Sequence, residues 1–404
     1  MKVLFVCHRL PYPPNSGGKI RSFNMIEHLS QRHSVIVASL AHTPEELDEG
    51  KRLENYCDGV IVEVVPDRVR WLNAFKALPT SVPSSVAYFW SSHLHRRIDE
   101  TIQSTKFDVV MAHCAFVAHY IEETHGTLRI LDFCDIDSAK WREYGHHRSF
   151  PLSSGYAFEA KKLRTYESRV AAKFDHCTVT TQGEKEEFES LGTGMPCTII
   201  PNGVDTTYFS PTEVRRPAEP IIVFLGRMDY FPNIDGVCYF AEDVFPLVRK
   251  QIPAAKFIVV GSEPSRRVRD LNGIPGISVT GHVPDVRMYL KDAAVSIAPL
   301  RIARGTQNKI LESMAMGIPV VATPQAAKGI QAIPGRHLLV AEHPHKFAEK
   351  LVDILLNENL RRDLSAAACK HLNHSHTWPN SMKILDELLM QGNVTMEATK
   401  IAKR

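Results

Sequence analysis

The residues best placed to do chemistry lie in residues 301–324, which read RIARGTQNKILESMAMGIPVVATP. Lys309 and Glu312 stand one turn apart, on the same face of a predicted helix. A lysine at a helix start, where backbone N–H groups lack partners, suits an anion such as a phosphate. The carboxylate does not suit phosphate, but it can accept hydrogen bonds from the two hydroxyls of a ribose. The pair predicts a nucleoside diphosphate site.

The loop before this helix completes the predicted anion site. Gly305 lets the chain turn, and three polar residues at the helix entry add hydrogen-bonding groups: Thr306, Gln307 and Asn308. The alternative is a capped helix with an ion pair between Lys309 and Glu312. That alternative explains the charges but not the polar run.

A second segment, FLGRMDYFPNIDG, places an arginine directly after an apolar run. Arg227 follows Gly226, and a helix that starts near Asn233 adds the positive end of its dipole. Arginine can bind oxyanions through two parallel hydrogen bonds. A surface arginine without a ligand is the alternative, and the first segment favours the anion site.

The N-terminal segment CHRLPYPPNSGGKIRSFNMIEHL places two glycines at a helix start. Gly17 and Gly18 would allow backbone N–H groups to approach a phosphate or a sugar. The segment is not a Walker loop, because Pro13 takes the position of the first glycine and Ile20 follows Lys19. A plain glycine-rich helix start is nearly as good an interpretation.

Parallel strands must position these residues. Apolar, β-branched runs alternate with helical patterns, first as KVLFVCH, SVIVASL, GVIVEVV, FDVVMAH, LRILDFC and CTVTT, and then as PIIVFLG, KFIVVG, GISVTG, AAVSIAP, PVVAT and HLLVA. Such runs predict two α/β domains with parallel sheets, whose ligands bind beyond the carboxyl ends of the strands. We expect an N-terminal domain (1–204), a linker (205–219), a C-terminal domain (220–378) that carries the predicted anion site, and a final helix (379–404).

The composition narrows the class of protein. The chain has 404 residues, 44% hydrophobic and 23% charged, with a net charge of +3 and a pI near 8.3. These values suit a globular protein of two domains and do not indicate a nucleic-acid partner. The eight cysteines form no C-x-x-C pair and are interpreted as reduced core residues. The absence of a signal peptide and of a long apolar run predicts a cytoplasmic protein.

The motifs together resemble a known family. PNGVD with a following F-x-P, FLGRM and KILESMAMGIPVVAT are similar to the GT-B glycosyltransferases of the retaining family 4 type, over nearly the whole chain. PYPPNSGGKIRSFN, LDFCDIDSAKW and RGTQNKILESMAMG resemble most the sugar transferases of bacterial exopolysaccharide and exosortase gene clusters. The resemblance implies two Rossmann-like domains facing a cleft, and a last helix that crosses back to the N-terminal domain.

The resemblance also implies roles for single residues. Gly17 and Gly18 would face the donor phosphates, Arg227 and Lys309 would grip the diphosphate, and Glu312 would bind the ribose. His282 and Val283 in TGHVPD would lie along the base, and His113 at a strand end would lie beside the donor sugar. A lone histidine after an apolar strand is otherwise more often a buried core residue.

Two positions depart from the family pattern. The glutamate that the family carries eight positions before the ribose glutamate is replaced here by Arg304. The lysine that often stands six positions after the arginine is replaced by Asn233. We interpret Arg304 as a donor-binding residue to which the charge has moved, and a solvent-facing arginine is the alternative.

The segment DFCDIDSAKW contains the D-x-D spacing of metal-dependent GT-A transferases. It lies in the first of two α/β domains, where Asp137 or Ser138 could cap the next helix. We therefore expect no metal. Asp135, at the end of a strand, is a candidate base on the acceptor side.

The segment DRVRWLNAFKALP contains three basic residues, Arg68, Arg70 and Lys76, around Trp71, Leu72 and Phe75. Residues 68–78 could contact a membrane surface or a lipid-linked acceptor. A helix packed on its own domain is the favoured interpretation.

We predict a hexosyltransferase that moves a sugar, with retention, from a nucleotide donor, most simply UDP-linked, to a saccharide or lipid-linked saccharide in exopolysaccharide synthesis. The nucleotide-sugar is a substrate, and no cofactor is expected. The enzyme would work in the cytoplasm or at the inner face of the plasma membrane. The alternatives are a nucleotide-sugar 2-epimerase and a non-catalytic subunit that binds a sugar nucleotide.

Overall fold

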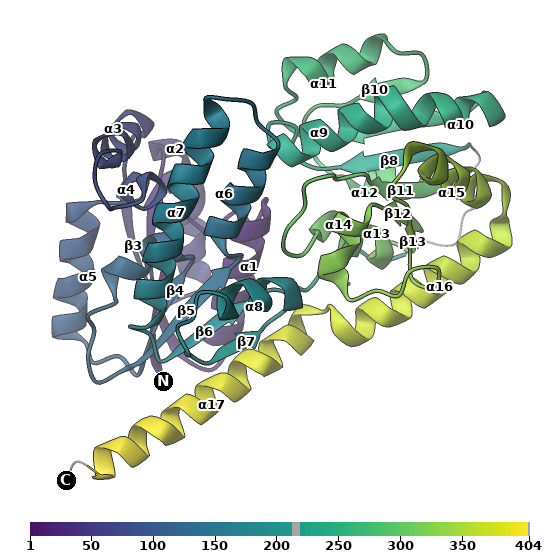
Figure 1. Ribbon diagram of the computed structural model, residues 1–404. Coiled ribbons are helices and arrows are strands. Elements are labelled where there is room, and N and C mark those ends of the chain that lie inside the picture. Colours follow the sequence, from purple (N-terminus) through teal and green to yellow (C-terminus); the bar gives the residue numbers. More distant parts are fainter. Residues whose placement is uncertain (212–218, 403–404) are drawn as a thin grey trace. The chain divides into compact units, whose positions relative to one another are not determined.

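A computed structural model describes residues 1–211 and 219–402 (Figure 1). The chain forms two compact units. Unit 1 comprises Met1–Pro201 and Met382–Arg404, and unit 2 comprises Asn202–Ser381. The first and last segments of unit 2 contact each other, since the backbone N–H of Val204 donates to the carbonyl of His376 at 2.9 Å. Part of the predicted linker, residues 212–218, lies outside the described residues.

Unit 1 contains a parallel sheet of seven strands in the order β3-β2-β1-β4-β5-β6-β7. The strands are β1 (Lys2–Cys7), β2 (Ser34–Ala41), β3 (Gly59–Val64), β4 (Val109–His113), β5 (Leu128–Cys134), β6 (His176–Val179) and β7 (Cys197–Ile199). The six runs predicted in the first half of the chain are confirmed as strands. The seventh strand, β7, is too short to show a pattern in the sequence.

Unit 2 contains a parallel sheet of six strands in the order β10-β9-β8-β11-β12-β13. The strands are β8 (Ile221–Leu225), β9 (Lys256–Val260), β10 (Ile277–Val279), β11 (Val295–Ala298), β12 (Val320–Ala322) and β13 (Leu339–Val340). All six runs predicted in the second half are confirmed. Both faces of this sheet are buried, because Ile222 and Phe224 of β8 pack in one apolar cluster while Val223 and Leu225 pack in another.

Helices cover both sheets (Figure 1). Unit 1 has α1 (Gly17–Ser30), α2 (Pro44–Gly50), α3 (Asp67–Ala77), α4 (Ser84–Tyr88), α5 (Ser92–Ser104), α6 (Asp137–His146), α7 (Leu152–Ala171) and α8 (Gln182–Glu189). Unit 2 has α9 (Phe231–Tyr239), α10 (Phe245–Gln251), α11 (Arg266–Asp270), α12 (Arg287–Leu290), α13 (Asn308–Ala315), α14 (Pro324–Ala327), α15 (Pro344–Leu356) and α16 (Glu358–Ser375).

The last helix, α17 (Trp378–Ala402), begins in unit 2 and continues in unit 1. Its Asp386 accepts a hydrogen bond from His28 of α1 at 2.9 Å, and its Leu385 and Leu389 are buried. The expected return of the C-terminal helix to the N-terminal domain is confirmed.

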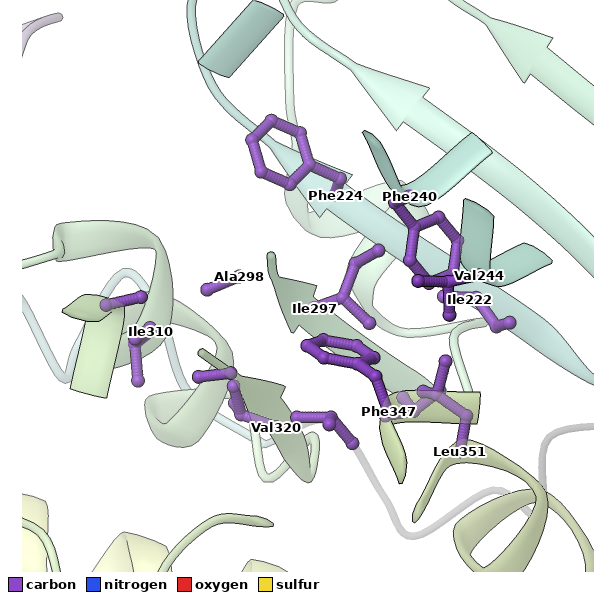
Figure 2. Close-up of a cluster of buried hydrophobic side chains, with 14 of the residues drawn as sticks. Ile222, Phe224, Phe240, Val244, Ile297, Ala298, Ile310, Val320, Phe347 and Leu351 are labelled. Carbon is purple, nitrogen blue, oxygen red and sulfur yellow. The ribbon is translucent and has the colours of Figure 1, made fainter. Parts of the chain in front are cut away.

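The core of unit 2 is built from aromatic and aliphatic side chains of the sheet and its helices. Figure 2 shows Phe224 and Ile297 of β8 and β11 with Phe240, Phe347 and Leu351 from the covering helical segments. Each side chain of this size contributes about 1.5–3 kcal/mol when fully buried. This core fixes the strands whose ends carry the predicted site.

Both sheets have the same point at which the strand order reverses. In each sheet the first three strands (β1 to β3, or β8 to β10) are added in one direction from the first strand. The following strands, from β4 or from β11, are added on its other side. In open α/β sheets, ligands bind beyond the carboxyl ends of the strands at such a point. The segments after β8 and β11 are therefore the expected ligand site of unit 2.

Candidate functional site

The centre of the candidate site in unit 2 is a contact between Lys309 and Asn233. The Nζ of Lys309, in the first turn of α13, donates to the side-chain oxygen of Asn233 at 2.6 Å. The same Nζ lies 4.1 Å from the centre of the Phe224 ring. The side-chain amide of Asn233 donates in turn to the carbonyl of Arg227 at 2.8 Å. One asparagine therefore joins the segments that follow β8 and β11.

Gly226 makes this close packing feasible. A Cβ at this position would lie 2.7 Å from the Asn233 side-chain nitrogen and 3.2 Å from the Lys309 Nζ. Any larger residue would push the asparagine or the lysine away. The glycine that follows β8 therefore leaves room for the Asn233 amide and the Lys309 amine that it holds.

Helix α13 holds Lys309 in place through its buried face. Ile310 and Leu311 are buried, and the Ser313 hydroxyl donates to the hydroxyl of Ser296 in β11 at 2.8 Å. The apolar face points into the core, so Lys309 and Glu312 stand on the remaining face, where both are half-buried.

The pKa values of Lys309 and Glu312 are shifted in opposite directions. Burial lowers the pKa of Lys309 to about 7, although the nearby Glu312 carboxylate opposes this shift. Burial raises the pKa of Glu312 to about 7, and Lys309 opposes that shift. Each residue is poised to gain a full charge when a partner of opposite charge or a hydrogen-bonding ligand arrives.

The loop between β11 and α13 is shaped as predicted at Gly305, which has a φ of +63°. The Gln307 side chain donates to the carbonyl of Arg304 at 3.0 Å, and the Asn308 side chain accepts from Asn202 at 3.4 Å. The hydroxyl of Thr306 is buried and has no hydrogen-bond partner within the described residues. The side chain of the N-cap residue, Gln307, makes no capping hydrogen bond to α13.

The backbone carbonyl of Arg227 is linked to Lys309 through Asn233. The Arg227 guanidinium instead contacts the carboxylates of Asp229 and Glu263. It donates to Asp229 at 2.6 and 3.1 Å and to Glu263 at 2.9 Å. These contacts, led by the Asp229 hydrogen bond, raise the pKa of the arginine. The side chain is 45% exposed, so it can reach a ligand by exchanging carboxylates for phosphate oxygens.

The other predicted residues of unit 2 follow β10 and β11. His282 is exposed, and Val283 packs on the apolar cluster that contains Val223 and Leu225. Arg304 is half-buried in the loop before α13. These positions are compatible with the predicted contacts to the base and the donor, which stay predictions.

In unit 1, Gly17 and Gly18 form the exposed start of α1, after β1. A Cβ at Gly18 would have no atom within 4 Å. Within the described residues, therefore, no neighbour requires a glycine there. Lys19 is engaged by Glu46 at 2.8 Å.

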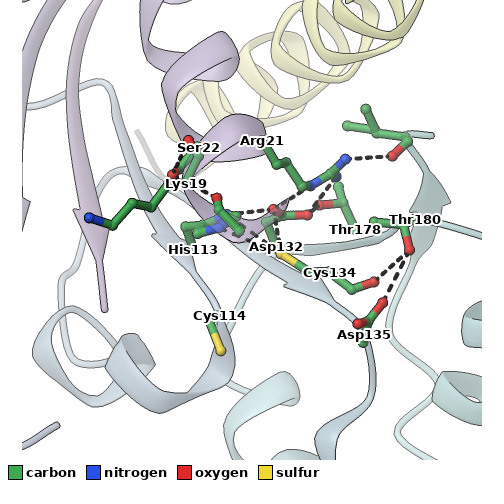
Figure 3. A network of polar contacts seen from close by, with 12 residues as sticks. Lys19, Arg21, Ser22, His113, Cys114, Asp132, Cys134, Asp135, Thr178 and Thr180 are labelled. Atoms are coloured by element: carbon green, nitrogen blue, oxygen red, sulfur yellow. Dashed lines mark hydrogen bonds and ion pairs between the residues drawn. The ribbon is translucent and has the colours of Figure 1, made fainter. Parts of the chain in front are cut away.

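The predicted His113 belongs to a buried ionic network in unit 1 (Figure 3). Its Nδ1 lies 2.8 Å from Asp132, which also receives two hydrogen bonds from Arg21 at 2.8 and 2.9 Å. Thr178 donates to the same carboxylate at 2.7 Å. The guanidinium of Arg21 and the histidine hold the pKa of Asp132 far below its usual range despite burial.

This network supports the structural interpretation of His113, whose side chain is 1% exposed. Asp132 and Arg21 fix the ring at the end of β4, so a role beside the donor sugar stays a prediction. His113, Asp132 and Cys134 also offer three potential metal ligands within 4.8 Å of one another. A cation there would have to displace the Arg21 guanidinium, which already neutralises Asp132, so the chemistry of these residues does not favour a metal.

Asp135 follows β5, is partly buried, and accepts from the hydroxyl of Thr180 at 3.4 Å. The predicted cap at Asp137 or Ser138 is wrong, because the N-cap residue of α6 is Ile136. Carboxylates from other helices do the capping instead. Glu184 accepts from Ile136 N–H at 2.6 Å, and Glu167 accepts from Ser138 N–H at 3.0 Å.

Two charged residues of the network were not identified from the sequence. Asp132 is an acid inside the apolar run LRILDFC, and Arg21 follows Gly17 by one helical turn. A charged residue within a buried strand needs a partner. The acid in an apolar run therefore indicated that Asp132 has a buried partner, but the sequence could not identify Arg21, which lies 111 positions away.

Comparisons with known proteins agree with this architecture. Residues 16–208 match the model of glycosyltransferase family 4, and residues 219–357 match the model of the group 1 glycosyl transferases. A 44.6 kDa protein in the cps region of Klebsiella pneumoniae is 20% identical over 407 residues, covering 96% of this chain and 99% of that protein. A GDP-mannose-dependent phosphatidylinositol dimannoside mannosyltransferase of Mycobacterium tuberculosis is 29% identical over 40% of this chain and 44% of its own.

Solved structures share the fold. Sucrose-phosphate synthase from Thermosynechococcus elongatus has a TM-score of 0.74 at 16% identity, covering 97% of this chain and 99% of that chain. Anabaena HepE in complex with UDP has a TM-score of 0.71 at 13% identity, covering 97% and 100%. The two family models match one unit each. The chain belongs to the family 4 glycosyltransferases and has the GT-B fold.

Proposed function

We propose that this enzyme transfers a sugar from a UDP-sugar to a saccharide or lipid-linked saccharide, with retention of the anomeric configuration, in exopolysaccharide synthesis. The observation that carries the proposal is the joint placement of Lys309, Asn233 and Arg227 after β8 and β11. The Lys309 amine, the backbone of Arg227 and the start of α13 meet where the strand order reverses, and the exposed Arg227 guanidinium could turn from its carboxylates toward a ligand. This arrangement suits the diphosphate of a sugar nucleotide.

The same groups would serve the reaction. Negative charge develops on the diphosphate as its bond to the sugar breaks, and Lys309, Arg227 and the dipole of α13 would stabilise it. In a front-face attack the departing diphosphate takes the proton of the acceptor hydroxyl, which gives retention. The proposal requires no cofactor. Glu312 would accept hydrogen bonds from the ribose, and the burial that raises its pKa would be relieved by those hydroxyls.

The choice of uridine is supported by the HepE complexes with UDP and with UDP-glucose. A second candidate is a guanosine donor, because the mycobacterial relative is GDP-mannose-dependent. The role in exopolysaccharide synthesis is supported by the Klebsiella relative in a cps region. A lipid-linked acceptor would bring the enzyme to a membrane surface, with residues 68–78 as the expected contact.

A donor screen tests the proposal. The full chain is incubated with UDP-, GDP- and ADP-sugars, and slow hydrolysis is followed by release of the nucleoside diphosphate. We expect release from UDP-sugars, retained configuration in the first sugar product, and loss of release in Lys309→Ala. Release from GDP-sugars alone would replace uridine by guanosine. Epimerised UDP-sugar, or UDP-sugar binding without turnover in the presence of saccharide acceptors, would overturn the proposed reaction.

A further inference from the structure

Helix α3 of unit 1 buries small and polar residues and exposes its large apolar ones. The residues that it buries are Arg70, Ala74 and Ala77, which are small or polar. Its large apolar residues point outward instead. Trp71 is 66% exposed, and Phe75 is 71% exposed. A helix of a globular domain normally buries its apolar stripe. Here only the edge of the outward face is engaged, where the Trp71 ring lies 5.3 Å from the ring of Tyr88, and most of the face stays exposed.

The exposed apolar surface extends beyond α3. We call it the apolar ridge, and it consists of Trp71, Leu72, Phe75, Leu78, Val82 and Phe158. Phe158 comes from α7, and its ring lies 5.0 Å from the Nζ of Lys162. That Nζ donates to carbonyls of Leu78 and Val82, which brings the two segments together. Figure 1 shows α3 and α4 beside α7.

Two buried charges of α7 hold the ridge rigidly. Lys162 donates to the carbonyls of Ala77, Leu78 and Val82 at 2.9 to 3.1 Å, at the C-terminal end of α3. Glu159 accepts from the backbone N–H groups of Ser84 and Ser85 at 3.1 and 2.8 Å, at the start of α4. Each charge is placed where the helix dipole favours it. The apolar side chains are thus presented by a fixed scaffold.

Positive charges flank the ridge. Three exposed basic residues flank it: Arg68, Lys76 and Lys161. Residues 66–82 and 146–161 contain two acidic residues, of which Asp67 is exposed and Glu159 is buried. Exposed tryptophan and phenylalanine between lysine and arginine side chains are typical of a surface that enters the headgroup region of a membrane. A second copy of the chain would place these same cations opposite one another, which disfavours a symmetric dimer through the ridge.

We infer that the apolar ridge and its flanking cations bind the surface of a bilayer that contains anionic lipids. Among the described residues, no helix combines the length and the hydropathy needed to cross a bilayer, so the contact would be peripheral. The inference goes beyond the transfer reaction and rests on the proposed function only in that a lipid-linked acceptor gives the contact a purpose. It requires no reaction step.

Sedimentation with vesicles tests the inference. The full chain is mixed with sucrose-loaded vesicles of phosphatidylcholine, alone or with phosphatidylglycerol. We expect binding to the anionic vesicles that weakens in high salt. Trp71→Ser/Phe75→Ser should lose more than about tenfold in affinity. Arg68→Gln/Lys76→Gln should lose on the order of 25-fold, from about fivefold for each cation.

Leu356→Ser is the matched control, because Leu356 is 71% exposed in unit 2. It should bind vesicles as the wild type does. All variants should keep the wild-type melting temperature and UDP affinity, so a failure of the proposed function would leave the vesicle result standing. No binding of the wild type to anionic vesicles, or unchanged binding by Trp71→Ser/Phe75→Ser, would overturn the inference. A dimer that the double variant abolishes, without vesicle binding, would show that the ridge binds a second copy instead.

Discussion

Lys309 Nζ lies 2.6 Å from the side-chain oxygen of Asn233. Asn233 stands at the position where the family pattern often has a lysine. The neutral amide of Asn233 positions the Lys309 amine and adds no second positive charge to the site. Asn233→Ala should weaken UDP binding by about 1 kcal/mol, or about fivefold, because the amine loses its positioning partner. Asn233→Asp should weaken binding more, because its carboxylate would neutralise Lys309. Calorimetry measures both variants, and equal losses would mean that Asn233 only supports the backbone of Arg227.

Arg227→Ala and Lys309→Ala should each raise the dissociation constant for UDP by about 10- to 150-fold, since a hydrogen bond to a charged group contributes about 1.5–3 kcal/mol. Binding of uridine, which lacks phosphate, should change little. Lys256→Ala is a control, because Lys256 starts β9 at the opposite ends of the strands and pairs with Glu219 at 2.8 Å. Equal losses for UDP and uridine would refute the assignment of the two cations to the diphosphate.

UDP binding should depend on pH through Lys309, whose pKa is lowered to about 7 by burial. The diphosphate favours the charged amine, so the affinity is highest below this pKa and falls by up to about tenfold per pH unit above it. Calorimetry between pH 7 and 9 avoids the titration of the terminal phosphate, near pH ~6.

Lys309→Arg separates this titration from that of Glu312, because a guanidinium stays charged over the whole range. The variant should show a flatter profile than the wild type. If the two profiles keep the same slope, the titration of Lys309 does not control binding.

Glu312→Gln should lose much of the preference for ribose over deoxyribose. The ionised carboxylate accepts two hydrogen bonds, whereas the amide offers one acceptor. Affinities for UDP and 2′-deoxy-UDP are compared at pH 8, above the pKa of about 7 to which burial raises this residue. We expect a smaller ratio of the two affinities in the variant, and an unchanged ratio would remove Glu312 from the ribose.

Arg304 replaces a glutamate of the family, and its guanidinium suits oxyanions. Arg304→Ala and Arg304→Glu are assayed with neutral and uronic donors. Loss of rate with every donor would indicate a contact with the diphosphate, which is the expected result, and Arg304→Glu should lose more. Loss with the uronic donor alone would indicate a carboxylate on the sugar. Wild-type rates throughout would leave the solvent-facing alternative.

The sequence by itself determined the strands and the place of the candidate site. Twelve strands could be predicted because β-branched, apolar runs are a local property, and their alternation with helices requires parallel sheets. The motif around Lys309 and Glu312 could be recognised as a candidate site because residues three positions apart on a helix share a face whatever the rest of the chain does. The same local pattern failed at α6, where Asp137 looks like a cap.

Only the tertiary structure decided which partners these side chains have. Asn233 and Lys309 are 76 positions apart, and Arg21 and Asp132 are 111 apart. Such pairs form because a parallel sheet brings helices, strands and loops that are distant in the sequence into contact, and no short sequence window contains both members. The structure likewise showed that Glu167 and Glu184 cap α6, that His113 is buried on Asp132, and that α3 turns its aromatic face outward. Burial and pairing depend on what packs against a residue, which its neighbours along the chain do not specify.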